Sequence, residues 1–167
     1  LAIGEGVHYS PLAMRSHEIW REIEKETAAK LMVTTGGLMI SSPSRSSRLH
    51  VDNFLGNTIS AARKYNIKHE ILDAREIRRR FPPFAVRDDE TGYYEPEAGY
   101  LRPEECIRAQ LELAHKHGAT VHTGETVRSF DADANGATVN TDKKTYRTGT
   151  LIVSAGAWLP QLLSKNY

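Results

Sequence analysis

Segments with helical periodicity alternate along this chain with short runs of β-branched and aromatic residues. The longest helical segment opens with Ser10 as the expected N-cap and Pro11 in its first turn, and its apolar residues recur every three or four positions. Asn135-Gly136 lies between two extended runs, which is a strong signal for a β-hairpin. This alternation predicts a mixed α/β (α+β) fold.

The same pattern gives the expected bounds of the elements. Helices are predicted over residues 10–27, 48–65, 73–80 and 103–118. Strands are predicted at 32–35, 38–41, 69–72, 93–95, 99–101, 120–122, 126–130, 137–140, 145–147 and 151–153. Gly36-Gly37 should bend the chain between the first two strands. Gly118 should close the helix predicted over 103–118. The residues expected on the buried side of that helix are Cys106, Ile107, Gln110, Leu111 and Ala114.

Composition excludes several classes of protein. The 167 residues carry a net charge of +1 with Lys and Arg scattered, so no nucleic-acid footprint is indicated. The run Arg78-Arg79-Arg80 is interpreted as the last turn of a short helix, with an anion site as the alternative. No apolar stretch reaches the length of a membrane helix and no secretory signal is visible, so we expect a soluble, cytoplasmic protein. A single cysteine, Cys106, excludes an internal disulfide and is expected to be a core residue.

Familiar catalytic patterns are missing from the sequence. His115 and His117 are two residues apart and would point in different directions on a helix, so a metal site is not expected. There is no phosphate loop, and Ser154 lacks the glycine that precedes the serine of a nucleophile elbow. Gly4-Glu5-Gly6 has neither a preceding strand nor a correctly spaced third glycine, so it is not a dinucleotide fingerprint.

One segment has a functional interpretation. Leu151-Ile152-Val153 is a continuous apolar run, typical of a strand buried on both faces, and it leads into Ser154-Ala155-Gly156-Ala157-Trp158. A turn from a strand into a helix at this point would expose backbone N–H groups at the carboxyl end of a sheet, where α/β folds bind ligands. Gly156 would let a ligand approach the backbone, although a glycine here is also explained by turn geometry alone.

Several segments, in order and with matching spacing, resemble the monomeric sarcosine oxidase and N-methyltryptophan oxidase family of FAD-dependent oxidoreductases. The resemblance runs from near residue 4 to the end of the chain. It is carried by Gly4-Glu5-Gly6, Tyr9 to Ala13, Arg15 to Trp20, Glu24 to Thr27, Thr35 to Leu38, Tyr94 to Gly99, Cys106 to Ala109 and Leu151 to Trp158.

The resemblance implies an FAD-binding domain of the glutathione-reductase type, interleaved with a mixed-sheet substrate domain. Residues 1–30 and 104–167 would belong to the first, and residues 31–103 to the second. Family members oxidise the C–N bond of N-methyl amino acids: a hydride equivalent passes to FAD, the imine is hydrolysed, and oxygen is reduced to hydrogen peroxide. The implied partner is a small secondary amine or amino acid.

Carried over residue by residue, the resemblance assigns cofactor contacts and no catalytic residue. Val127 would meet the adenine, and Ser154, Gly156 and Trp158 would lie along the dinucleotide. The family's N-terminal GxGxxG turn and its C-terminal substrate pocket have no counterpart here, and Cys106 does not match the flavin-linking cysteine. We therefore expect an interior piece of a flavin oxidase that is inactive alone and does not retain FAD.

Two alternatives remain open. The scaffold could serve as a non-catalytic interaction module, or the enzyme could act on glycine or a D-amino acid. The missing first strand of the parallel sheet would uncover the edge or face around residues 151–153, and an uncovered strand invites pairing with another chain. We therefore expect self-association, or local disorder near the N-terminus and Tyr167.

Overall fold

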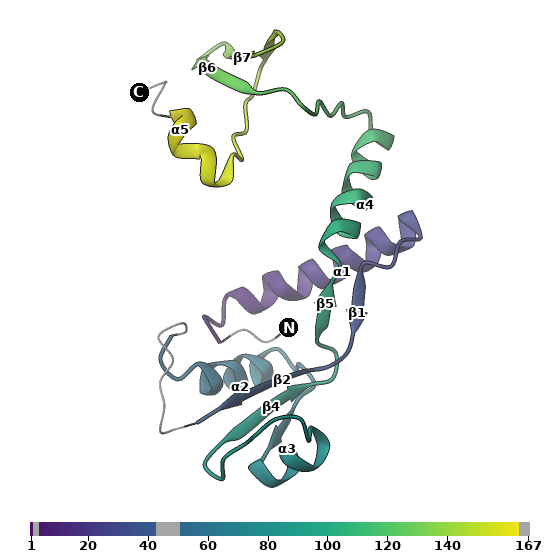
Figure 1. Ribbon diagram of the computed structural model, residues 1–167, viewed down its shortest axis with the longest axis vertical. Coiled ribbons are helices and arrows are strands. Elements are labelled where there is room, and N and C mark those ends of the chain that lie inside the picture. Colours follow the sequence, from purple (N-terminus) through teal and green to yellow (C-terminus); the bar gives the residue numbers. More distant parts are fainter. Residues whose placement is uncertain (2–3, 43–50, 164–167) are drawn as a thin grey trace. The chain divides into compact units, whose positions relative to one another are not determined.

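The computed structural model describes residues 1, 4–42 and 51–163 (Figure 1). These residues form two compact units, Leu1–Gly118 and Ala119–Tyr167, and each is described by itself. Helices and short strands are mixed in the first unit, which confirms the α/β class. Among the described residues no helix is long and apolar enough to cross a membrane.

Two helices and a two-stranded ribbon share one core in the first unit. α1 (Tyr9–Thr27) contacts α4 (Pro103–Lys116), and β1 (Met32–Thr34) pairs antiparallel with β5 (Gly99–Leu101). The core residues are fully or nearly buried because each is small or apolar and faces a neighbouring element. They are Leu31, Cys106 and Ala109, with Trp20, Ile23, Ala29 and Leu101 packed against them.

The ends of these helices differ in part from the prediction. His8, not Ser10, holds the N-cap position of α1, and Ser10 lies inside the first turn with a fully buried hydroxyl. Gly118 adopts a φ of 85°, as expected for a glycine that follows the end of α4. The predicted buried side of α4 is wrong at Ile107 and Leu111, which are 58% and 41% exposed. The residues of α4 that face the core are Cys106, as predicted, and Ala109. They are three positions apart and therefore lie on the same face of the helix.

Cys106 is a core residue, as predicted. Its side chain is buried, and this burial raises the pKa of the thiol. A thiol that stays protonated is a poor nucleophile, so Cys106 contributes packing and not chemistry.

Two further cores form on the faces of a three-stranded sheet, whose strand order is β2-β4-β3. Its strands are β2 (Gly37–Ser41), β4 (Thr91–Glu95) and β3 (Glu70–Leu72), all antiparallel. Because successive strand residues point to opposite faces, Met39 packs with α2 (Phe54–Lys64) while Leu38 and Ile40 pack with α3 (Ala74–Arg80). The two helices therefore cover opposite faces of this sheet.

The predicted bend between the first two strands is confirmed. Gly36 has a φ of 75°, a region that favours glycine, and it separates β1 from β2 so that each joins a different sheet. Residues 48–50 of the predicted second helix lie outside the described residues, and α2 begins at Phe54.

The basic run Arg78-Arg79-Arg80 forms the last turn of α3, as predicted. Each guanidinium is paired with a carboxylate: Arg78 with Asp88, Arg79 with Glu76 at 2.7 Å, and Arg80 with Glu70 at 2.6 Å. Because each of these three arginines already forms an ion pair with a carboxylate, we prefer the interpretation as a helix end over that as an anion-binding site.

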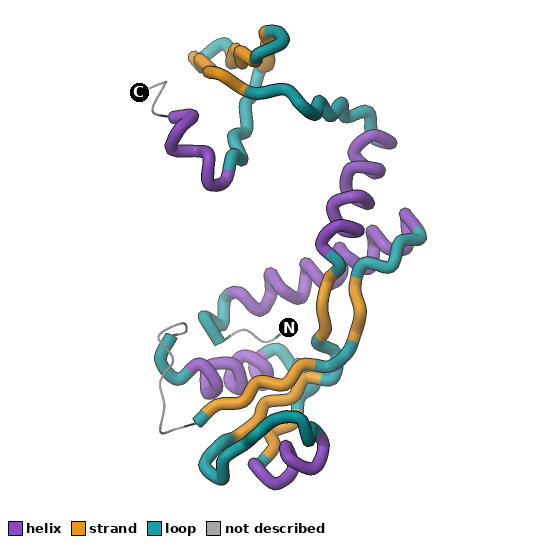
Figure 2. Tube along the Cα trace, in the orientation of Figure 1, coloured by secondary structure: helices purple, strands orange, loops and turns teal. Residues whose placement is uncertain are grey.

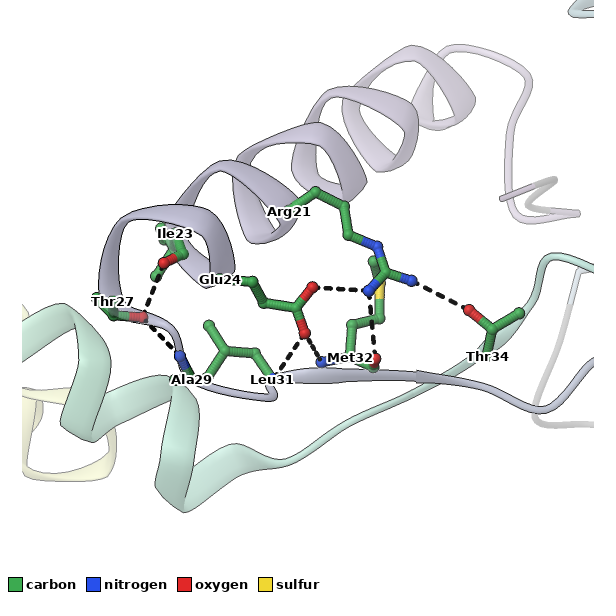
Figure 3. A network of polar contacts seen from close by, with 8 residues as sticks. All are labelled: Arg21, Ile23, Glu24, Thr27, Ala29, Leu31, Met32 and Thr34. Carbon is green, nitrogen blue, oxygen red and sulfur yellow. Dashed lines mark hydrogen bonds and ion pairs between the residues drawn. The ribbon is translucent and has the colours of Figure 1, made fainter.

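A polar clasp joins α1 to β1 (Figure 3). Glu24 Oε1 accepts hydrogen bonds from the backbone N–H groups of Leu31 and Met32 at 2.8 and 2.9 Å. Arg21 donates to Glu24 Oε2 at 2.6 Å and to Thr34 Oγ1 at 3.1 Å. We call these two side chains the Arg21–Glu24 clasp. It gives partners to backbone N–H groups at the start of β1.

The clasp should make stability depend on pH. Burial alone would raise the pKa of Glu24, but hydrogen bonds from Met32, Arg21 and Leu31 outweigh it, so the pKa lies below its ordinary value of 4.5. A lowered folded-state pKa gives stabilisation that is fully present above the ordinary value and is lost as pH falls through the folded value. We expect the difference in unfolding free energy between wild type and Glu24→Gln to be constant near neutral pH and to shrink in that acidic range. Urea titrations at a series of pH values measure it, and a difference that grows on acidification would contradict the assignment.

Tyr93 and Glu95 form a buried polar pair on β4. Tyr93 is 3% exposed and Glu95 is 2% exposed, and the phenol donates to Glu95 Oε2 at 2.8 Å. The Leu1 nitrogen also contacts this carboxylate. Burial, followed by the hydrogen bond to Glu95, raises the pKa of Tyr93, so the phenol remains a donor.

Removing this donor should destabilise the first unit. Tyr93→Phe leaves a buried carboxylate oxygen without its phenol, at a cost of about 1–3 kcal/mol in unfolding free energy. Tyr100→Phe is the matched control, because Tyr100 is 53% exposed and its hydroxyl can be hydrated. Equal effects of the two substitutions in chemical denaturation would show that the Tyr93–Glu95 bond contributes nothing.

The second unit is a three-stranded meander followed by a loop and a short helix. β6 (Val127–Asp133), β7 (Gly136–Thr141) and β8 (Thr145–Thr148) pair antiparallel in sequence order. The hairpin at Asn135-Gly136 is confirmed, with Gly136 at a φ of 137°. The strand predicted at 120–122 is wrong, because these residues have no ladder partner.

Candidate functional site

The start of β6 is fixed by contacts across the meander. Thr126 and Asp142 are bonded to one another twice: the Thr126 N–H donates to Asp142 Oδ1 at 2.9 Å, and the Asp142 N–H donates to the Thr126 carbonyl at 3.0 Å. Val127 follows directly and pairs with Thr141, before a register irregularity between Val127 and Ser129. Its side chain is 43% exposed. Val127 is therefore held in place by its backbone while its side chain stays accessible.

Glu125, just before this strand, belongs to a hydrogen-bonded cluster. Its carboxylate accepts from Thr141 Oγ1 at 2.6 Å and from the Tyr146 hydroxyl at 2.9 and 3.0 Å. The hydrogen bond from the Thr141 hydroxyl is the main cause that lowers the pKa of Glu125. Desolvation opposes this shift, and the hydrogen bond from Tyr146 adds to it. The Lys144 ammonium lies 4.6 Å from the centre of the Tyr146 ring. This carboxylate is consequently an ionised acceptor that ties β7 and β8 to the start of β6, and a poor general base.

The segment before the predicted glycine turn differs from expectation. Residues 151–153 form a loop and not a strand (Figure 2). The Ile152 side chain is 84% exposed. The prediction of a strand buried on both faces is therefore wrong for this structure. A strand of that kind needs a neighbour on each side, and the described strands of the second unit, β6, β7 and β8, pair only with one another.

The turn into a helix is present. A 3-10 turn at Gly156–Trp158 continues into α5 (Leu159–Leu163), and the Trp158 N–H donates to the Ala155 carbonyl at 3.0 Å. Gly156 has a φ of 52°, and a Cβ added there would meet no atom within 4 Å. Ser154 is exposed and the Trp158 side chain is 70% exposed. The backbone at this turn is thus open to a ligand, beside an accessible indole.

All four residues assigned by the sequence lie in the second unit. Ser154, Gly156 and Trp158 occupy one short segment, and Val127 lies at the start of β6. None is buried, as a surface that receives a ligand requires. Among the described residues, no contact that the structure records joins Val127 to the segment that holds Ser154, Gly156 and Trp158.

Sequence reasoning did not find a hollow of about 280 Å³ in the first unit. α1 contributes His17 and Trp20 to it, β1 contributes Met32, the turn before β5 contributes Glu97, and β5 contributes Tyr100. The helical spacing of Ala13, Ser16, His17 and Trp20 was the available signal, because these positions share one face of α1. Predicting the hollow also required the position of β5, which follows from pairing across more than sixty residues.

A second hollow, of about 320 Å³, lies along the β6–β7 hairpin. Its lining includes Asp131, Asp133, Asn135 and Arg147. Within residues 1, 4–42 and 51–163, no group of three or more His, Cys, Asp or Glu side chains could hold a metal ion.

Comparison with known proteins now identifies the family. The family model described as FAD dependent oxidoreductase matches residues 3–166. The chain belongs to this family. Its curated relatives include the monomeric sarcosine oxidase of Bacillus sp. (strain B-0618), 39% identical over 98% of this chain and 40% of the relative. The enzyme of the same name from Streptomyces avermitilis is 36% identical over 93% of this chain and 39% of its own length.

A further curated relative and two solved structures extend the comparison. The N-methyl-L-tryptophan oxidase of Yersinia pestis (strain Pestoides F) is 30% identical over 97% of this chain and 42% of its own length. The solved structure of NikD, an unusual amino acid oxidase essential for nikkomycin biosynthesis, matches with a TM-score of 0.78 and 28% identity over 93% of this chain and 39% of that one. Glycine oxidase from Geobacillus kaustophilus, 19% identical with a TM-score of 0.73, shows the fold alone. The chain spans about two fifths of the length of these relatives.

The residues present fit one side of an FAD site. The open backbone at Gly156 and the accessible Trp158 indole suit close contact with an extended dinucleotide. The chain contains no glycine-rich turn between a strand and a helix that would bind the pyrophosphate. These residues can therefore contact FAD but supply only part of what holds it.

Proposed function

We propose that this chain is part of a larger FAD-dependent oxidase that oxidises the C–N bond of an N-methyl amino acid such as sarcosine. The observation that carries the proposal is the family match over residues 3–166, together with an open glycine turn at the position expected to contact the cofactor. The chain spans about two fifths of relatives named monomeric sarcosine oxidase, which motivates a larger functional unit.

The assigned residues position the cofactor in this proposal. FAD supplies the two-electron redox chemistry when bound. The Val127 backbone contacts the adenine end, while Gly156 admits the dinucleotide to the main chain because it has no Cβ. Ser154 offers a hydroxyl and Trp158 an apolar ring along the same path. No residue of the chain is assigned a catalytic role, and residues 1–167 alone are inactive.

We also propose that residues 1–30 and 104–167 belong to the flavin domain and residues 31–103 to the substrate domain. Support comes from the packing of α1 against α4, in which Trp20 and Ile23 pack against the core that contains Cys106 and Ala109. The sheet β2-β4-β3 has its own cores with α2 and α3. A shared core between the two flavin-domain segments agrees with this division, although the compact units divide between Gly118 and Ala119.

Steady-state oxidation tests the proposed substrate class. A polypeptide of family length that contains these residues should produce hydrogen peroxide from sarcosine or N-methyltryptophan. Glycine, proline and D-amino acids serve as comparison substrates. Activity on glycine or a D-amino acid without activity on any N-methyl amine would replace the proposed substrate. Failure to bind FAD at all would favour a non-catalytic interaction module.

A further inference from the structure

One carboxylate joins the start of β6 to the other two strands of the meander. Glu125 lies two positions before the strand, and its Oε1 accepts from Thr141 Oγ1, at the end of β7, at 2.6 Å. The Tyr146 hydroxyl of β8 lies 2.9 Å from Oε2 and 3.0 Å from Oε1. These partners are 16 and 21 positions away along the chain, so Glu125 restrains the start of β6 through tertiary contacts.

Thr141 connects this carboxylate to the turn between β7 and β8. Its hydroxyl oxygen accepts from the backbone N–H groups of Lys143 at 3.1 Å and Lys144 at 2.9 Å. The single hydroxyl proton has two acceptors within reach, the Lys144 carbonyl at 2.7 Å and the Glu125 carboxylate at 2.6 Å. An ionised acceptor forms the stronger hydrogen bond. Glu125 is therefore the charged member of a cluster that includes this turn.

The backbone polar groups of Val127 point away from β7. The Asp142 N–H donates to the Thr126 carbonyl at 3.0 Å. The Thr141 N–H donates to the Lys144 carbonyl at 2.9 Å and is not available to Val127. Val127 and Thr141 are therefore a non-hydrogen-bonded pair, in which the N–H and C=O groups turn away from the partner strand. Val127 consequently presents one donor and one acceptor on the same side of β6.

We propose that Glu125 is a positioning residue for adenine recognition, because it fixes the position in which Val127 presents its N–H and C=O groups to the adenine of FAD. This inference rests on the proposed function, in which the Val127 backbone contacts the adenine end. Adenine carries a ring-nitrogen acceptor beside an amino donor, which complements a backbone donor and acceptor on one side of a strand. Glu125 acts through Val127 and does not contact the base itself.

The residue before Glu125 supplies little restraint of its own. Gly124 has a φ of 61°, and a Cβ added there would meet no atom within 4 Å. A glycine in open space allows the backbone many conformations. Without the Glu125 carboxylate, the start of β6 keeps the two bonds between Thr126 and Asp142 but loses its hydrogen bond to β8. Val127 should then present its backbone groups over a wider range of positions.

Binding of ADP and inosine diphosphate to the flavin-free, family-length polypeptide tests the proposal. Hypoxanthine, the base of inosine diphosphate, reverses the donor and acceptor that adenine offers on this edge. Equilibrium dialysis should show that the wild type prefers ADP by at least roughly tenfold. Glu125→Ala should lower this preference by roughly threefold to tenfold. A residue that only stabilised the fold would weaken the binding of both nucleotides equally and leave the preference unchanged.

Two further variants and one control complete the test. Glu125→Gln keeps an acceptor oxygen without the charge and should show an intermediate preference. Tyr146→Phe removes one donor to the carboxylate, and it should lower the preference even if Glu125→Ala fails to fold. Asp131→Ala is the control, because Asp131 is an exposed carboxylate of the same strand, paired with Thr138, and its loss should leave the preference unchanged.

The outcomes separate this inference from the proposed function. A wild-type polypeptide without a preference for ADP overturns the inference, and so does a preference that survives intact in Glu125→Ala or, where that variant does not fold, in Tyr146→Phe. The proposed function is tested independently by hydrogen peroxide production. A polypeptide that prefers ADP through Glu125 but oxidises no N-methyl amine would refute the proposed substrate and support the inference.

Discussion

Replacing Glu24 with alanine should lower the unfolding free energy by about 2–4 kcal/mol, because hydrogen bonds to a charged group are lost and backbone donors near the core lose their acceptor. Glu24 is the single acceptor for the N–H groups of both Leu31 and Met32, and Leu31 is fully buried. The Arg21 guanidinium loses its carboxylate at the same time. Urea denaturation followed by circular dichroism gives the change in free energy.

Glu26→Ala is the matched control, two positions along α1. Glu26 accepts from Lys116 Nζ at 2.8 Å, but both side chains are exposed to solvent and the pair is easily replaced by water. Its loss should leave stability nearly unchanged. If Glu24→Ala were as mild as Glu26→Ala, the clasp would not hold α1 to β1.

Replacing Gly99 with alanine should destabilise the first unit by at least about 2 kcal/mol, because overpacking forces backbone to move. A Cβ at this position would overlap the Val33 carbonyl oxygen and approach the Val33 carbonyl carbon to 2.9 Å. Both atoms belong to the main chain of β1, which pairs with β5 at this point. A side chain there cannot rotate out of contact, so the ribbon must separate.

The control for this substitution is Gly149→Ala, since a Cβ at Gly149 would meet nothing within 4 Å. Loss of a flexible glycine at an unhindered site should leave stability equal or slightly higher. Thermal unfolding of the two variants distinguishes them. A Gly99→Ala protein as stable as wild type would mean that β1 and β5 do not approach this closely.

The sequence predicted local structure correctly where residues close together in the chain determine it. Asn135-Gly136 specifies its hairpin because a tight turn needs a positive φ, and Gly36 specifies a bend for a related reason. Arg78, Arg79 and Arg80 end a helix whose N-cap, Asp73, accepts from the Glu76 N–H at 2.7 Å. Such features depend on residues a few positions apart.

The predictions were wrong where contacts with residues distant in the sequence determine burial and strand formation. Ile152 lies in an apolar run typical of a buried strand, but no described strand pairs with it and it is exposed. Ile107 and Leu111 were assigned to a buried face that α1 and the β1–β5 ribbon do not cover. The Arg21–Glu24 clasp was not predicted, because in the sequence Glu24 looks like an ordinary solvent-exposed carboxylate on a helix. Its role depends on the position of β1 beside α1.

In the candidate site, too, local structure could be predicted from the sequence, whereas the contacts with FAD could not be derived from it. The turn at Gly156 was predictable from its glycine and the apolar run before it, and the structure confirms a turn into a helix there. The assignment of Val127, Ser154, Gly156 and Trp158 to FAD came from the family resemblance and stays a prediction. Their common exposure in one unit is compatible with it.

FAD binding to the purified 167-residue chain tests the central claim most directly. In the proposed enzyme this chain supplies one wall of the cofactor site, and it lacks the glycine-rich turn for the pyrophosphate. Equilibrium dialysis should therefore find no tight, stoichiometric FAD on residues 1–167, whereas a family-length polypeptide containing them should retain it. Stoichiometric flavin absorbance on the 167-residue chain after dialysis would contradict the account.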